Sequence, residues 1–299
     1  KVRFLSNNQQ AKYIYKVQPG TGSWENQNGT PPVWSEDALN TGSDSYFNSF
    51  TDLSSPGWSY DGNYISFIHS TPGGESSFGL YDIKGGRYLP SARGCDLRWS
   101  PVENSYLLSR CDYGGGLFKS QKNDLASLVR LLEGEFSDSE INYSAPAYAA
   151  DGSRVAFLYS REFEDQIYLG LAKADGSAFT EVAANLLYDY QHRSGPFFSA
   201  DGNRIYYMKE IAGMQVLLTR ELPDGEESNF LIMPGGYVNW FFMRWTAEGY
   251  LAIVGTYYHD FETSGARLII IDPSAGNLVY AGAPINGFVY FAGFSKVPY

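Results

Sequence analysis

Short apolar runs separated by a polar turn recur along the chain. At 195–208, a run that contains two aromatic residues is followed by Ser-Ala-Asp-Gly-Asn and then by a second run rich in β-branched and aromatic residues. Asp-Gly between two such runs predicts a β-hairpin, because glycine accepts the positive φ that a tight turn requires. Close copies of this hairpin lie at 56–67 and 146–157, and partial copies lie at 98–104 and 244–249. The pattern therefore predicts a chain built from a repeated β unit.

An aromatic residue marks the same position in every copy. These anchors follow one another at intervals of about 40–50 residues, a period typical of β-propellers with four-stranded blades. They are Trp58, Trp99, Tyr148, Phe198, Trp245 and Phe294. A third apolar run and a second turn follow the hairpins, as such a blade requires. The six anchors predict an all-β protein, a six-bladed β-propeller of four-stranded antiparallel blades.

The two ends of the chain each supply part of a unit. Residues 287–295 form a first strand with nothing after it, whereas 2–5 and 11–17 supply later strands with no first strand before them. We expect strands from both termini to build one closing blade, because closure removes exposed sheet edges. The predicted organisation is a single propeller over 1–299, with a closing blade from 286–299 plus 1–35, a loop insertion at 36–55, and blades near 55–92, 93–135, 143–187, 193–233 and 238–282.

The repeated pattern Pro-x-aromatic-Ser-Pro/Ala-Asp-Gly-x-x-Ile-aromatic resembles that of the TolB-like propeller family, which is related in style to the propellers of prolyl-oligopeptidase-type peptidases. The match is close at 58–67, 148–157 and 198–206, and it is partial at Trp99 and Trp245. The resemblance covers the whole chain. Its motif specifies how a blade folds and not what the propeller binds, but TolB-like propellers commonly serve as interaction platforms.

Charge and composition narrow the classes of partner. The net charge is −11 and the sequence pI is about 4.8, and no dense basic patch is present, so nucleic-acid binding is not expected. No apolar run reaches the roughly 18 residues that a membrane-spanning helix needs. We expect a monomer that binds a protein, peptide or glycan. Because the chain begins at Lys1 and shows no signal sequence, we expect it to be a mature or trimmed form.

The two cysteines flank the second hairpin. Cys95 and Cys111 could lie opposite each other on antiparallel strands, where Cβ atoms come within roughly 4.5–5.5 Å, close to the spacing that a disulfide needs. Two buried thiols are the alternative. A disulfide would indicate an oxidising compartment. We predict an extracytoplasmic location, which is periplasmic, cell-surface or secreted.

Propeller topology sorts the loops between two faces. The segments that enter each first strand and leave each second strand surround the channel on one face, which we call the mouth face. The opposite face carries the Asp-Gly turns, and we call it the turn face. Polar and aromatic residues on loops of a rigid scaffold are typical of binding sites. The mouth-face candidates are His69, Asp96, Arg110, Asp112, Tyr113, Arg161, Glu162, His192, Arg193, Lys209, Glu210, Trp240, Tyr257, Tyr258, His259 and Asp260.

Three functions are compatible with this arrangement. The leading hypothesis is an extracytoplasmic, non-catalytic binding propeller without a cofactor. The second is a metal-dependent polysaccharide lyase or hydrolase that holds a divalent metal at the channel mouth through His69, His192 and His259. The third is a sensor domain cut from a larger regulatory chain. No Gly-x-Ser-x-Gly elbow is present, so the hydrolase partner of peptidase propellers is not predicted here.

Two segments depart from the plain repeat. The loop at 36–55 carries Tyr46, Phe47 and Phe50, and we expect an ordered flap that narrows the mouth, with a path along the outer rim as the alternative. Residues 121–135 have helix-like spacing with Asp124 placed to cap a helix. Their position in the repeat nevertheless predicts the outer strand of the second blade.

Overall fold

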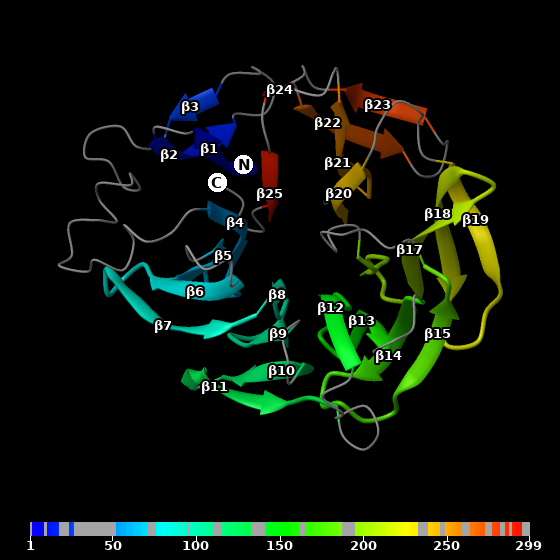
Figure 1. The fold of residues 1–299 in the computed structure, drawn as a ribbon, viewed down its shortest axis with the longest axis horizontal. Coiled ribbons are helices and arrows are strands. Elements are labelled where there is room, and N and C mark those ends of the chain that lie inside the picture. Colours follow the sequence, from blue (N-terminus) through cyan, green and yellow to red (C-terminus); the bar gives the residue numbers. More distant parts are fainter. Residues whose placement is uncertain are drawn as a thin grey trace.

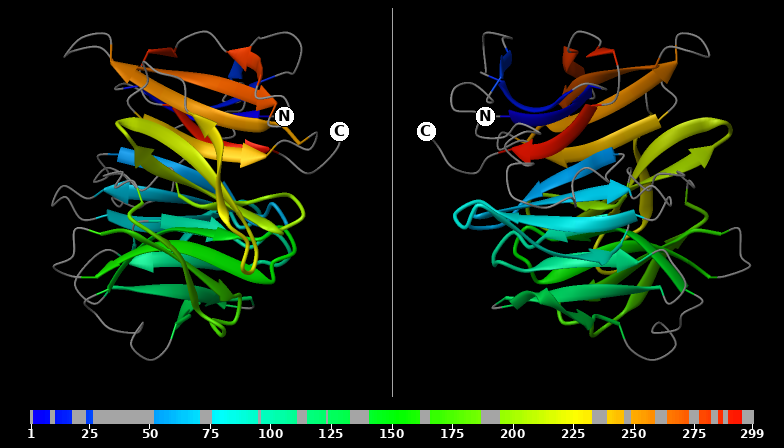
Figure 2. Two further views of the ribbon diagram at one scale, coloured as in Figure 1. Left: turned by 90° about the vertical axis from the view of Figure 1, so that its right-hand side faces the viewer. Right: turned by 60° about the vertical axis from the view of Figure 1, so that its left-hand side comes forward.

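Antiparallel sheets stand side by side around a common centre in the computed structural model (Figure 1). Figure 2 shows the same sheets from the side, with their strands running between the two faces of the ring. The structure describes residues 2–8, 11–17, 24–26, 52–70, 76–94, 96–110, 115–122, 124–132, 141–161, 166–186, 195–232, 239–245, 249–258, 264–272, 277–281, 285–286 and 289–294, with only the backbone described in parts of several strands. No helix occurs in these ranges, so the protein is an all-β propeller.

Five of the sheets are each formed by consecutive strands of one segment, in sequence order from one edge to the other. The first contains β4 (Asp52–Trp58), β5 (Tyr64–Ser70), β6 (Ser76–Asp82) and β7 (Arg87–Arg93). The second contains β8 (Asp96–Trp99), β9 (Tyr106–Arg110), β10 (Gly116–Gln121) and β11 (Asp124–Arg130). The third contains β12 (Ile141–Tyr148), β13 (Arg154–Arg161), β14 (Tyr168–Lys173) and β15 (Thr180–Ala184).

The fourth and fifth sheets complete the set. The fourth contains β16 (Phe197–Phe198), β17 (Arg204–Ile211), β18 (Met214–Glu221) and β19 (Glu227–Ile232). The fifth contains β20 (Asn239–Trp245), β21 (Leu251–Tyr258), β22 (Ser264–Asp272) and β23 (Asn277–Ala281). The short strand β24 (Ile285–Asn286) also pairs with β22, which the repeat did not predict.

A further sheet joins the two ends of the chain. It contains β25 (Val289–Phe294), β1 (Val2–Asn8), β2 (Ala11–Val17) and β3 (Trp24–Asn26), in that order. Strand β1 pairs antiparallel with β25, with Leu5 opposite Tyr290 and Ser6 opposite Val289. Strands from both termini therefore lie in one sheet (Figure 1).

Side-chain hydrogen bonds hold the predicted hairpins in shape. In the first sheet, the Ser59 hydroxyl donates to the Asp61 carboxylate at 2.7 Å, and the Tyr64 N–H donates to Ser59 Oγ at 2.9 Å. The Asp61 carboxylate also accepts the Asn63 N–H at 2.9 Å, while Gly62 takes a φ of 71°. Glycine occupies this position because it adopts the left-handed conformation without steric cost. The Ser-x-Asp-Gly pattern is therefore a turn-forming unit.

Two other hairpins have an aspartate at the position equivalent to Asp61. The carboxylate of Asp201 accepts hydrogen bonds from Ser199 Oγ and from the Asn203 N–H, as Asp61 does. In the third sheet Ala149 stands at the serine position, and Asp151 is held by the N–H and hydroxyl of Ser153 instead. The hairpin that carries the repeat signal is thus built locally from a few residues of its own turn.

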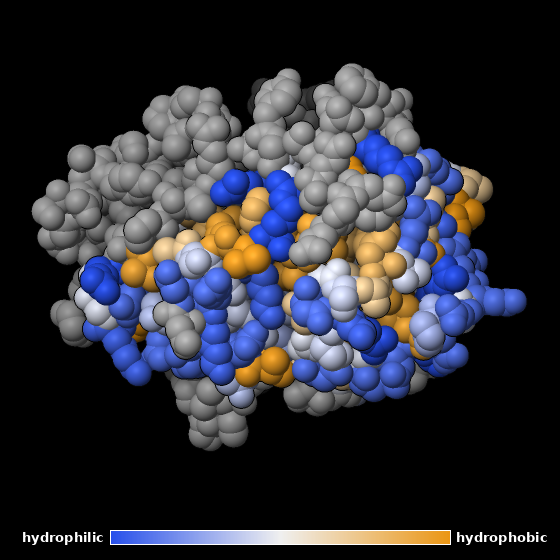
Figure 3. All heavy atoms as spheres, turned by 90° about the horizontal axis from the view of Figure 1, so that it is seen from below, coloured by the Kyte–Doolittle hydropathy of each residue, from blue (hydrophilic) through white to orange (hydrophobic). Residues whose placement is uncertain are grey.

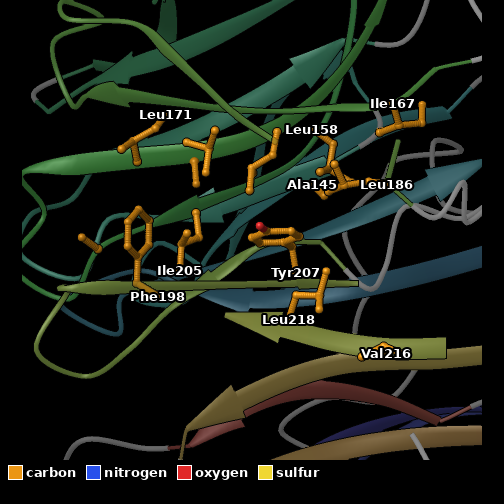
Figure 4. Close-up of a cluster of buried hydrophobic side chains, with 14 residues drawn as sticks. Ala145, Leu158, Ile167, Leu171, Leu186, Phe198, Ile205, Tyr207, Val216 and Leu218 are labelled. Carbon is orange, nitrogen blue, oxygen red and sulfur yellow. The ribbon is translucent and has the colours of Figure 1, made fainter. Parts of the chain in front are cut away.

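Both faces of a sheet are apolar, because each face packs against a neighbouring sheet. Figure 4 shows the core between the third and fourth sheets, where Leu158 and Leu171 point toward Phe198, Ile205 and other buried side chains. A second core, between the second and third sheets, includes Leu117 and the ring pair Tyr143 and Phe157. Burying apolar area on both faces is what stabilises the ring.

Hydrogen bonds cross the same boundaries. Trp99 Nε1 of the second sheet donates to Ser66 Oγ of the first at 3.0 Å. Arg154 Nη2 of the third sheet donates to the Gly202 carbonyl in the fourth hairpin at 2.6 Å. Arg220 also donates to the Val182 carbonyl across the boundary between the third and fourth sheets. These bonds fix the relative positions of neighbouring sheets.

The predicted strand over the helix-like segment is confirmed, because β11 covers Asp124–Arg130. Asp124 caps no helix, and its carboxylate accepts the Ala126 N–H at 3.2 Å. Strand β4 begins at Asp52, within the loop expected at 36–55, and the rest of that loop lies outside the described residues. Cys95 and Cys111 also lie outside them, so the disulfide stays a prediction.

The Asp61 turn predicts an acid-sensitive contribution to stability. Partial burial alone would raise the pKa of Asp61, but hydrogen bonds from Asn63 and Ser59 outweigh it and lower the pKa to about 2. A depressed carboxylate pKa stabilises the fold above the unfolded pKa, and this contribution is lost as the pH falls through the folded pKa. We expect Asp61→Ala to lower the free energy of unfolding by about 1 kcal/mol at pH 7, after allowance for solvent screening.

Urea denaturation of wild type and Asp61→Ala at pH 7 and at pH 2.5 measures this effect. The difference between the two proteins should shrink at the lower pH. Asp224→Ala is the control, since in the described part of the chain Asp224 is exposed and accepts no hydrogen bond. An equal difference at both pH values would show that the carboxylate charge does not matter.

Candidate functional site

The structure places only some of the predicted mouth-face side chains. Side chains are described for Asp96, Arg110, Arg161, Lys209 and Glu210. Only the backbone is described for His69 in β5, Trp240 in β20, and Tyr257 and Tyr258 in β21. Outside the described residues lie Asp112, Tyr113, Glu162, His192, Arg193, His259 and Asp260. The predicted histidine cluster and the rest of that set stay predictions.

Asp96 links two sheets. It opens β8, its side chain is 7% exposed, and its Oδ2 accepts the Ala145 N–H of β12 at 2.9 Å. The register of β12 shifts between Ser144 and Ala147, and Ala145 has a φ of 47°. This bulge turns the Ala145 N–H toward the neighbouring sheet. Sequence analysis predicted Asp96 as a binding residue, whereas its described contact is internal.

Asp96 also lies near a second charge. Burial lowers the pKa of Arg98, and the negative charge of Asp96 opposes that shift. The Arg98 guanidinium donates to the Leu97 carbonyl at 3.3 Å. A buried carboxylate therefore serves both a backbone N–H and a nearby cation at the start of the second sheet.

Arginine side chains lie over aromatic rings where strands end at the mouth face. The guanidinium carbons of Arg110 and Arg130 lie 4.6 and 5.2 Å from the centre of the Phe118 ring. In the third sheet, Arg161 lies 5.3 Å from the centre of the Tyr168 ring. Each stacked cation contributes roughly 0.5–1 kcal/mol at an exposed site. A guanidinium over a ring can still present its N–H groups to a planar acceptor such as a carboxylate.

Two glycines allow close contacts at the mouth end of the second sheet. A Cβ on Gly116 would lie 3.0 Å from Arg130 Nη1, and a Cβ on Gly115 would lie 2.7 Å from the Ile141 carbonyl oxygen. Ile141 pairs with Arg161 across β12 and β13. The glycines thus let the mouth end of the second sheet approach the mouth end of the third. The prediction included Arg110 and Arg161 but missed Arg130, which lies far along the chain in the outer strand.

Lys209 has internal partners. Its Nζ lies 2.8 Å from Glu227 Oε2, and the Tyr207 hydroxyl donates to the same oxygen at 2.6 Å. Burial would raise the pKa of Glu227, but hydrogen bonds from Lys209 and Tyr207 outweigh it and lower that pKa. Glu227 therefore stays ionised and holds Lys209 on the fourth sheet. The neighbouring Glu210 side chain is exposed.

A cleft of about 620 Å³ opens on the turn face, between the second and third sheets. Turns and strand ends that are distant in sequence line it: Glu103, residues 119–122, residues 129–131, Ser153 and residues 173–175. Lys119 Nζ spans the boundary, 3.2 Å from Glu103 Oε1 and 3.4 Å from the Ala174 carbonyl oxygen. Figure 3 shows the edge of the ring, seen from below the view of Figure 1, where small apolar groups lie among hydrophilic residues.

Sequence analysis did not predict this cleft. Its lining comes from four turns and from the end of β11, and no local motif marks any of them. The one signal is topological, because turns after first strands and turns after third strands must share a face. Within the described ranges, no group of three or more His, Cys, Asp or Glu side chains is placed to hold a metal ion. In those same ranges, no helix is present that could cross a membrane.

No family model matches the chain, and no curated protein matches it. Solved propellers match it in structure. TolB from Acinetobacter baumannii aligns over 97% of this chain with a TM-score of 0.60 and 14% identity, and this chain spans 65% of that protein's length. TolB from Agrobacterium tumefaciens aligns over 92% of this chain and 95% of its own, with a TM-score of 0.58 and 14% identity.

Prolyl oligopeptidase B from Galerina marginata is also similar. It aligns over 90% of this chain and 40% of its own, with a TM-score of 0.59 and 12% identity. At these identities the likeness is one of fold. The chain therefore has a TolB-like propeller fold, as the repeat motif predicted, and the residues of its site must be argued from its own geometry.

The contacts of Asp96 predict a large cost on its removal. In Asp96→Ala, the Ala145 N–H loses its acceptor and Arg98 loses a nearby countercharge, so we expect a loss of about 3 kcal/mol in the free energy of unfolding. Asp96→Asn keeps an acceptor and should lose about 1 kcal/mol. Urea denaturation at pH 7 measures both. Glu210→Ala, on the same face but exposed, should change stability by less than about 0.5 kcal/mol. Equal losses in Asp96→Ala and Glu210→Ala would contradict an internal role for Asp96.

Proposed function

We propose that this protein is a non-catalytic binding propeller that acts outside the cytoplasm and recognises a protein, peptide or glycan at its mouth face. The partner carries carboxylate groups. The observation that supports this proposal is the set of guanidinium groups held over Phe118 and Tyr168 where strands end at the mouth face. A planar guanidinium matches a carboxylate with two parallel hydrogen bonds.

The scaffold suits this role because hydrogen bonds between sheets fix the relative positions of the strands that carry the arginines. Sheet boundaries are tied by hydrogen bonds such as those from Trp99 to Ser66 and from Arg154 to Gly202. A site that is already ordered loses less conformational entropy on binding. Stacked arginines also rank among the side chains that contribute most at protein interfaces. The similarity to TolB structures supports the fold on which this proposal rests.

The proposal includes the architecture predicted from the repeat. The sheet that combines β25 with β1, β2 and β3 acts as a sixth blade and closes the ring. Five blades come from contiguous segments, and the closing blade completes a monomeric domain over 1–299. The loop at 36–55 belongs to the mouth face in this proposal, as a wall of the site.

Site-directed photocrosslinking tests the binding function. A photoreactive amino acid is placed at Glu210 on the mouth face or, as the matched control, at Lys84 in the β6–β7 turn on the turn face. Both positions are exposed. Irradiation in an extracytoplasmic extract of the source organism should give adducts from position 210 that depend on the mouth-face arginines, whereas any adducts from position 84 should not depend on them.

Arg161→Glu should reduce the mouth-face adducts about tenfold, because it reverses one charge at the site. The Arg161 side chain is exposed, so the variant should fold, which its thermal unfolding curve would check. Adducts from position 84 alone, or adducts from position 210 that are insensitive to Arg161→Glu, would contradict the proposal.

The extracytoplasmic location has its own test. We expect Cys95 and Cys111 to form a disulfide, since they flank the hairpin between β8 and β9. Thiol titration of the denatured, unreduced protein should find no free thiol, and two should appear after reduction. Two free thiols before reduction would remove this support for an oxidising compartment. Alkylating the cells before lysis controls for oxidation during purification.

A further inference from the structure

We propose that the cleft between the second and third sheets is a second binding site, on the turn face, for an extended peptide of a partner protein in which acidic residues flank an apolar side chain. Turns at the ends of β8, β10, β12 and β14 contribute to this site. Of the arginines described at the mouth ends of strands, Arg130 also lines the cleft, whereas Arg110 and Arg161 do not.

The acidic side chains that line the cleft form hydrogen bonds within the protein. Glu103 accepts hydrogen bonds from Ser105 at 2.8 Å and from Lys119, which lies 3.2 Å away. The Asp175 carboxylate is held by the N–H and hydroxyl of Ser177 at 2.9 and 2.7 Å. Both acidic side chains in the lining therefore have internal partners.

Two lysines of the lining are exposed: Lys122, in the β10–β11 turn, and Lys173, at the end of β14. Each lies within electrostatic reach of one acid of the lining, Lys122 of Glu103 and Lys173 of Asp175, but among the described residues neither forms an ion pair. They come from different sheets and line the same cleft. In a chain with a net charge of −11, the lining has a local excess of positive charge, with Lys119, Lys122, Arg130 and Lys173 against Glu103 and Asp175. It attracts carboxylates against the overall field.

The lining also contains three apolar residues, Val129, Leu131 and Ala174. Val129 is 51% exposed although it lies in β11, so it can contact a ligand. A lining with an exposed apolar side chain and an excess of cations fits a ligand that has both apolar and acidic groups. The volume of about 620 Å³ suits a few residues of peptide, since ligand pockets typically measure about 300–1,000 Å³.

Peptide is favoured over an acidic glycan or a free anion for this reason. An exposed valine offers nothing to inorganic phosphate and little to a uronic acid chain, whose faces are polar. A leucine or valine between acidic residues would bury Val129 and place carboxylates near Lys122 and Lys173.

Fluorescence anisotropy with a fluorescein-labelled Asp-Glu-Leu-Asp-Glu peptide tests the assignment. We expect binding to wild type with a dissociation constant below about 1 mM, and about tenfold weaker binding to Lys122→Glu and to Lys173→Glu. Val129→Asn should also weaken binding, because it removes apolar contact. A peptide with serine in place of leucine should bind more weakly than the probe.

The matched control is Lys84→Glu, which changes an exposed lysine in the corresponding turn of the first sheet and should leave the affinity unchanged. Arg161→Glu should also leave it unchanged, which separates this site from the mouth face. Thermal unfolding checks that each variant is folded.

Several results would overturn the proposal. They are binding weaker than about 1 mM to wild type, equal loss of affinity in Lys84→Glu, and loss of affinity in Arg161→Glu. Displacement of the probe by trigalacturonate or inorganic phosphate as readily as by unlabelled peptide would assign the cleft to an anion and not to a peptide.

Discussion

The fold depends on the need of every sheet to bury two apolar faces. In the third sheet, Leu158 faces the core shared with the fourth sheet, while Phe157, its neighbour in the same strand, faces the core shared with the second. Successive side chains of a strand point to opposite faces, so a strand with no polar face has no stable exposed position. When such sheets stand side by side around a centre, each apolar face is buried, because each core is shared by two neighbouring sheets. The hydrogen bonds between sheets then decide how the neighbours align.

The packing of the sheets also decides which charged side chains are buried and which are exposed. Asp96 lies at a boundary where one sheet meets the backbone of the next, and its carboxylate accepts a hydrogen bond from the Ala145 N–H. At the mouth ends of strands and in the turns, where the sheets no longer cover one another, charged side chains are instead exposed, as Arg161 and Lys173 are. Charged residues therefore have structural contacts between sheets, whereas at the strand ends they are exposed.

Much of the fold could be predicted from the sequence because its main determinants are local. The Ser59 and Asp61 side chains close a turn within six residues, and this closure is visible as a motif. For β11, the place of the segment in the repeat outweighed its helix-like spacing. The site was predicted less well. The burial of Asp96, the stacking of Arg130 over Phe118 and the cleft beside Lys122 each depend on how separate sheets meet, and no single segment records that.

The pairing of β1 with β25 has a consequence for biosynthesis. Strand β1 is translated first, but the strand that covers its inner edge ends near Phe294, the partner of Val2. At roughly 5–20 residues per second, about 15–60 seconds separate the synthesis of the two. During that time the edge of β1 offers unpaired N–H and C=O groups to other chains. The nascent protein therefore passes through an interval in which β1 can pair with strands of other chains, and this edge is protected only once β25 has been made.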